Sequence, residues 1–93
     1  METVFFFKAL ADETRQTILR ALRDVDELSV TDICECLPHM SQPTVSHHLH
    51  VLRHCRLVET RKVGKQVFYQ LNRVTLHAAG NAFYLEWRIE RYE

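Results

Sequence analysis

The sequence is poor in features that mark several common protein classes. Its 93 residues contain two glycines and two prolines, so it has no glycine-rich loop for nucleotide phosphates. No window approaches the roughly eighteen apolar residues of a membrane span, and no basic segment followed by a long apolar run opens the chain. We therefore expect no membrane span and no signal peptide, and a cytoplasmic location.

Cysteine and catalytic groupings are scarce as well. The three cysteines fit reduced thiols, or metal or redox ligands, better than a disulfide framework. His54 and Cys55 are an adjacent base and thiol nucleophile, but neighbouring side chains on a helix point about 100° apart and no third group orients them. With no internal repeat and no linker, residues 1–93 are expected to form a single non-enzymatic domain.

Net charge is zero overall but unevenly distributed. Residues 1–40 carry four basic and eight acidic side chains, a net of −4, whereas residues 41–75 carry six basic side chains and one acidic, a net of +5. This split predicts a dipolar molecule with one basic face. Such a face can contact phosphates although the protein as a whole is not basic.

The functional prediction depends on residues 41–52, SQPTVSHHLHVL. Ser41 is a good helix N-cap, and an apolar stripe at i, i+4 and i+7 follows it. No acidic residue occurs from 41 to 56. The outward groups are short or planar hydrogen-bonding side chains, which suit base edges in a DNA major groove. We expect a recognition helix that contacts double-stranded DNA through Ser41, Gln42, Thr44, Ser46, His47, His50 and Arg53.

Four histidines in and after this segment need separate interpretation. His47, His50 and His54 recur at i, i+3 and i+7 on the outward face, a spacing that could hold a transition metal but here faces DNA. If they contact phosphate, DNA affinity rises as pH falls through about 6.5. His48 lies on the apolar side and is expected to be a half-buried structural residue.

Helices are predicted before this segment and strands after it. The first three helices span residues 3–10, 12–23 and 29–37, with a polar turn at 24–28 and a tight connection at 38–40 that makes a helix-turn-helix. Residues 57–63 and 66–71 alternate as two strands joined at Gly64 and Lys65, and residues 72–93 form a last helix. The predicted fold is mostly α with a β-hairpin wing, a winged helix-turn-helix of four helices, two strands and a final helix.

The hairpin and the aromatic residues suggest two contact surfaces. The tip of the wing is expected to carry Arg61, Lys62 and Lys65 to the DNA backbone or minor groove; a merely solvated hairpin is the alternative. Five Phe, three Tyr and one Trp exceed what so small a domain buries. A homodimer through the first and last helices would cover them. Its expected interface residues are Phe5, Phe6, Phe83, Tyr84 and Trp87.

Three motifs occur at characteristic intervals: ALAD-x-TR at 9–15, SQ-x-x-VS-x-HL at 41–49 and G-K-x-V-x-Y at 64–69. Through them, residues 5–72 resemble the ArsR/SmtB family of winged-helix repressors. The resemblance implies a dimeric repressor on a palindromic operator, released by a metal ion, a metalloid or another small signal. It also implies base contacts from Ser41, Gln42, Thr44, Ser46 and His47, and a wing containing Arg61, Lys62, Gly64 and Lys65.

The family's signal-binding motifs are incomplete in this chain. Thiolate sensors carry ELCVCDL where residues 27–33 read ELSVTDI, and the D-x-H of the last-helix zinc site is absent. Cys34 matches a third thiolate of some arsenic sensors, and Cys36 follows it; arsenic, zinc or cadmium would be the ligand. Side chains at i and i+2 point about 200° apart, so joint chelation requires the helix end to unwind at Pro38. Buried thiols, metal sensing and redox or persulfide sensing all remain open.

Two functional classes are therefore carried forward. The first is a sequence-specific DNA-binding repressor. The second is a winged helix that contacts another protein and responds to no inducer, which zero net charge and abundant aromatic residues would permit. The salt dependence of binding to duplex DNA distinguishes them, because phosphate contacts make the affinity for DNA fall steeply as the salt concentration rises.

Overall fold

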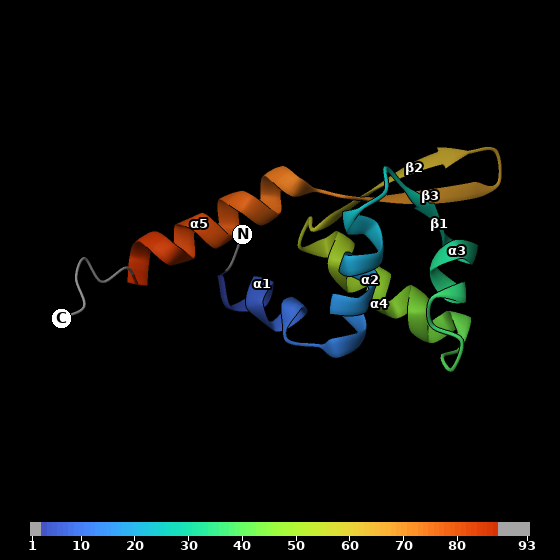
Figure 1. Ribbon diagram of the computed structural model, residues 1–93, viewed down its shortest axis with the longest axis horizontal. Coiled ribbons are helices and arrows are strands. Elements are labelled where there is room, and N and C mark those ends of the chain that lie inside the picture. Colours follow the sequence, from blue (N-terminus) through green and yellow to red (C-terminus); the bar gives the residue numbers. More distant parts are fainter. Residues whose placement is uncertain (1–2, 88–93) are drawn as a thin grey trace.

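The computed structural model describes residues 3–87 as five helices and three short strands (Figure 1). In chain order these are α1 (Thr3–Leu10), α2 (Glu13–Arg23), β1 (Leu28–Ser29), α3 (Val30–Glu35), α4 (Gln42–His54), β2 (Val58–Val63), β3 (Gln66–Leu71) and α5 (Arg73–Trp87). The predicted mostly helical fold with a β-hairpin wing is confirmed. In Figure 1 the wing and α5 extend in opposite directions from the helical body. No helix within residues 3–87 combines the length and apolar character that crossing a membrane requires.

The structure adds a strand that the sequence did not predict. Residues 24–28 were expected to form only a polar turn, but Leu28 pairs with Tyr69 and Ser29 pairs with Phe68, giving an antiparallel sheet of order β1-β3-β2. The reason is that β3 otherwise presents a row of unpaired backbone groups, which a short extended segment can satisfy. The pairing attaches the wing to the start of α3.

Side-chain caps determine where α3 and α4 begin. Ser29 accepts a hydrogen bond from the backbone N–H of Asp32 at 3.1 Å, and its own N–H donates to the Asp32 carboxylate at 3.2 Å, so the predicted capping box is present. Ser41 accepts from the backbone N–H of Thr44 at 3.3 Å. Both caps were readable from the sequence, and they fix the two helices of the helix-turn-helix.

The core lies between α2, α3, α4 and the base of the wing. The apolar stripe of α4 is buried as predicted, and Leu76 and Ala79 of α5 pack, partly buried, against the same core. The fully buried side chains include Phe6, Ile18, Leu22, Ile33, Val45, Leu49, Leu52, Cys55, Leu57 and Val58. Cys55 is thus a core residue, and its burial raises the pKa of the thiol.

Phe6 corrects one interface prediction. Its ring is 1% exposed within a single protomer, so it has no surface left for a partner. Three consecutive phenylalanines cannot share one narrow helix face, and the structure turns Phe6 inward while Phe5 and Phe7 remain half-buried. Phe6 is therefore a residue of the protomer's own core rather than of a dimer interface.

The last helix is the least buried element. None of its described residues is buried, and several apolar ones are largely exposed, including Phe83 (39%), Tyr84 (60%) and Trp87 (65%). It contacts α1, where the rings of Phe7 and Phe83 are 4.6 Å apart. At its start, Leu76 and Ala79 pack against the core, and the guanidinium of Arg73 donates to the carbonyl of Arg23 at 2.6 Å. The predicted helix reached residue 93, but residues 88–93 lie outside the described part. An apolar face of α5 is consequently left uncovered by the protomer.

Candidate nucleic-acid interface

Helix α4 presents the side chains that were predicted to read DNA. Its inward stripe is buried, and its opposite side is polar and free of acidic residues. All seven predicted residues are exposed: Ser41, Gln42, Thr44, Ser46, His47, His50 and Arg53. Because a major groove admits one α-helix and offers donors and acceptors on base edges, this face has the shape and chemistry for base readout.

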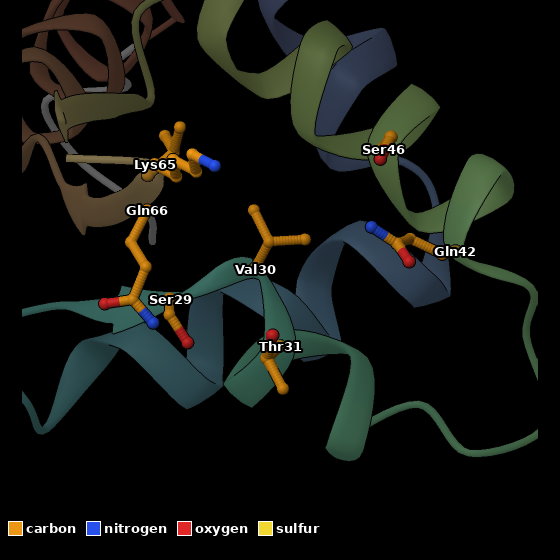
Figure 2. A pocket seen from close by; sticks show the side chains of 8 residues that line it. Ser29, Val30, Thr31, Gln42, Ser46, Lys65 and Gln66 are labelled. Atoms are coloured by element: carbon orange, nitrogen blue, oxygen red, sulfur yellow. The ribbon is translucent and has the colours of Figure 1, made fainter. Parts of the chain in front are cut away.

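A groove of about 290 Å³ separates the N-terminal end of α4 from the wing. Figure 2 shows Gln42 and Ser46 on one wall and Lys65 and Gln66 on the other, with Val30 between them. The described side chains that line this groove include no carboxylate. The contributions from the start of α3 and from Gln66 were not predicted, because only the β1 pairing brings these segments together.

Lys62 and Lys65 are the available cations of the wing. Both are exposed, and neither forms an ion pair within the part of the chain that the structure describes. Lys65 follows Gly64, whose φ of 60° lies in the left-handed region that glycine adopts without strain. The tight turn at Gly64 therefore brings Lys65 back beside the groove.

Arg61 lies elsewhere than predicted. It is not at the tip but opposite Phe68 in the hairpin, with its guanidinium 5.3 Å from the centre of that ring. Its Nε donates to the carboxylate of Glu27 at 3.1 Å, and a terminal nitrogen pairs with the other carboxylate oxygen. The same hydrogen bonding lowers the pKa of the Glu27 carboxyl. As the protein stands, Arg61 is bound to Glu27 rather than presented to DNA.

This ion pair leads to a testable expectation. Replacing Glu27 by Gln removes the carboxylate that holds Arg61 and frees the guanidinium for phosphate, and an exposed ion pair of this kind is weak enough for a modest effect. We expect Glu27→Gln to bind duplex DNA roughly two- to fivefold more tightly at low salt, with a steeper salt dependence, as measured by fluorescence anisotropy. Glu59→Gln removes the same charge from an exposed, unpaired site on β2 and is the control. Equal gains in both variants would mean that bulk charge, not Arg61, is responsible.

Arg15 joins α4 to the first two helices. Its Nε donates to the carbonyl of Ala9 at 2.7 Å and a terminal nitrogen donates to that of Lys8 at 3.3 Å, so it closes the C-terminal end of α1. The other terminal nitrogen lies 3.1 Å from Nδ1 of His48. The side chain of His48 is 13% exposed, which confirms the predicted half-buried structural histidine. The orientation of the recognition helix thus depends on a contact between residues 33 positions apart.

The titration of His48 gives a pH dependence with a defined sign. Burial lowers the pKa of this imidazole and Arg15 lowers it further, while Asp12, 3.9 Å away, opposes them. Since the folded pKa lies below the ordinary 6.5, the unfolded chain binds more protons in the window beneath 6.5. The stability contributed by neutral His48 is therefore present above that pH and is lost as pH falls through the folded pKa.

We accordingly expect the free energy of unfolding to be smaller at pH 5.5 than at pH 7.5, by urea denaturation. His48→Gln should flatten this dependence. His39→Gln, at an exposed histidine in the turn before α4, should keep it. A pH dependence that survives in His48→Gln would contradict the assignment to this residue.

The two candidate thiols do not form a metal site by themselves. Cys34 is half-buried and Cys36 is exposed at the end of α3, where helical dihedral angles persist through Cys36. The thiols thus keep the opposed directions of positions i and i+2. Within residues 3–87 no group of three His, Cys, Asp or Glu side chains could hold a metal ion. The described donor set therefore does not fit a three-ligand thiolate centre within one protomer.

The capped helix pair, the acid-free face of α4 and the wing beside it define a winged helix-turn-helix DNA-binding domain. The model of the bacterial regulatory protein arsR family matches residues 12–60, and the chain belongs to this family of transcriptional regulators. It is 42% identical over 85 residues to the arsenical resistance operon repressor of Escherichia coli K12, covering 91% of this chain and 72% of that protein. These findings confirm the predicted ArsR/SmtB relationship and the prediction that the protein is not an enzyme.

Two further similarities agree with this assignment. The cadmium resistance transcriptional regulatory protein CadC of Listeria innocua is 41% identical over 71 residues, which cover 76% of this chain and 59% of CadC. Reduced HlyU from Vibrio cholerae N16961 superposes with a TM-score of 0.71 at 37% identity, covering 92% of this chain and 88% of that structure. The fold and the family are thus supported by both sequence and structure.

Proposed function

We propose that the protein is a repressor that binds a palindromic operator in double-stranded DNA as a homodimer. Helix α4 of each protomer reads one half-site, and the wing contacts the adjacent backbone. The observation that carries this proposal is the exposed face of α4, which lacks acidic residues and borders a groove closed by Lys65. A repressor of this kind acts in the cytoplasm, where the chromosome lies.

The proposed dimer uses the surfaces of α1 and α5. Val4 on α1 is 65% exposed, and Phe83, Tyr84 and Trp87 on α5 leave an apolar area that the protomer does not cover. Such a patch is costly in water, and a two-fold pairing of identical patches covers it. A two-fold axis also relates two α4 helices, which matches a palindromic operator. Phe5 is half-buried against His54, with 5.4 Å between ring centres, so it supports this surface from beneath.

The direct test is a titration of the protein with its own upstream DNA, read by fluorescence anisotropy at two salt concentrations. Random duplex of the same length is the competitor. Specific binding that weakens steeply with salt supports the repressor. Binding that does not exceed that of random DNA, at either salt, would favour the protein-contact function of this winged helix instead.

A substitution at Lys65 tests the proposed phosphate contact of the wing directly. Removing one phosphate contact is expected to reduce the slope of log affinity against log salt by about one unit in Lys65→Ala. Arg20→Ala is the matched control, because Arg20 is an exposed cation on α2 that bonds only to Thr17 within the described residues. The wing assignment fails if both variants change the slope equally.

No metal ion is included in this proposal. The similarity to arsenical and cadmium resistance regulators makes arsenite, cadmium and zinc the first signals to test for release of DNA. On this chain the thiols available to such a signal are Cys34 and Cys36. Release that persists in the double variant Cys34→Ser/Cys36→Ser would show that neither thiol is needed.

A further inference from the structure

A second basic pocket lies at the opposite end of α4 from the groove. It has a volume of about 390 Å³ and is lined by His50, Arg53, His54 and Arg56. Each of these side chains is cationic or becomes so on protonation, and no acidic residue among 3–87 lines the pocket. We propose that this pocket binds a phosphate-type oxyanion.

Arg53 and Arg56 have no counter-charge among the described residues of the pocket. The described residues contain seven arginines, and five of them donate side-chain hydrogen bonds to protein acceptors: Arg15, Arg20, Arg23, Arg61 and Arg73. Arg53 and Arg56 make no such bond within residues 3–87, and both line the same pocket. Two adjacent guanidiniums without a carboxylate provide charge and donors for an anion supplied from outside.

The backbone at Arg56 adopts an unusual conformation for a non-glycine residue. Its φ of 63° makes it the only non-glycine residue among 3–87 in the left-handed region. The N–H of Arg56 donates to the carbonyl of Arg53 at 3.0 Å, and the N–H of Leu57 donates to that of Leu52 at 2.9 Å. This is the helix-ending motif in which glycine is ordinarily favoured. The chain carries a guanidinium at a position where glycine would be less strained, which is consistent with a use for that cation.

The two histidines of the pocket, His50 and His54, lie close together on α4. They are one helical turn apart, with ring centres separated by 6.2 Å and planes inclined by 25°. His54 is also held edge-on against Phe5 of α1. Imidazoles at i and i+4 can bind a divalent metal, but the two arginines beside them would repel a cation and attract an oxyanion. The charge of the pocket therefore selects the anion.

The oxyanion has two possible sources, a DNA phosphate or a free phosphate-bearing solute. The pocket shares His50 and Arg53 with the proposed DNA-reading face of α4 and extends beyond it through His54 and Arg56. His54 is eight residues from Ser46, or about 12 Å along the helix. The anion site can exist whether or not the protein is a repressor. Binding of a free anion to it can be measured in the absence of DNA.

The experiment is a titration of the full chain with inorganic phosphate, followed by amide chemical shifts in two-dimensional NMR at constant ionic strength. Sodium chloride at equal ionic strength is the blank. We expect saturable shifts centred on residues 50–56 in the wild type. In Arg53→Gln/Arg56→Gly the affinity should fall at least about tenfold, with Arg20→Gln unchanged. Glycine suits the backbone at position 56, so the double variant retains the fold.

The outcomes are distinguishable. Shifts that chloride reproduces, or that persist in the double variant, would overturn the site. If phosphate binds and the double variant also loses affinity for duplex DNA, the natural occupant is a backbone phosphate. If phosphate binds while DNA affinity is unchanged, the occupant is a free oxyanion. Failure of the upstream-DNA titration alone would reject the repressor and leave this pocket standing.

Discussion

Phe83→Glu is expected to weaken binding to the proposed palindromic operator by about 100-fold or more, by disrupting the proposed dimer, while leaving the protomer folded. The reason is that a dimer binds its second half-site as an intramolecular event, which adds about 10²- to 10⁴-fold in affinity without new contacts. Phe83 is 39% exposed on α5, beside Trp87 and against Phe7, at the centre of the uncovered apolar face. A carboxylate there opposes pairing of two such faces.

Sedimentation velocity and anisotropy on the same samples measure the two effects. Val25→Glu is the matched control, because Val25 is also 39% exposed but lies in the turn after α2. The control should stay dimeric and bind the operator. A Phe83→Glu protein that remains dimeric with full affinity would remove α5 from the proposed interface.

Leu52→Ala is expected to lower the free energy of unfolding by about 2–5 kcal/mol. Leu52 is fully buried on α4, and its loss leaves a cavity under the recognition helix. Since small domains have a total of about 5–15 kcal/mol, this single change removes a large share of the stability. Urea denaturation followed by circular dichroism gives the value. Val74→Ala, at a site 79% exposed on α5, should change it by less than about 0.5 kcal/mol. Similar losses in both variants would contradict the burial argument.

The parts of this protein that the sequence predicts are those with local causes. The stripe of Val45, Leu49 and Leu52 repeats at the helical period, and the cap of Ser29 acts on a residue three positions away. The hairpin follows from alternating side chains on both sides of a glycine turn. Each of these signals is contained within one element, so one sequence is enough to find it.

The parts that the sequence did not predict depend on distant residues. Glu27 and Arg61 are 34 positions apart, and a charged residue near a hairpin tip is indistinguishable in sequence from one already paired. Strand β1 is too short to show an alternating pattern of side chains in the sequence, and it forms because β3 lies beside it and pairs with it. Phe6 has phenylalanine neighbours on both sides, and it is the buried one only because of the direction in which α1 packs against the body. In each case the local sequence is compatible with more than one arrangement, and tertiary packing determines which one forms.

The two-residue strand β1 has a consequence for mechanical coupling. Ser29 pairs with Phe68 of the wing and at the same time caps α3, which packs against α4. A displacement of the hairpin therefore pulls on the first turn of the helix that supports the recognition helix. Because Ser29 joins the wing to the helix-turn-helix, we expect the two sides of the groove to unfold together rather than separately.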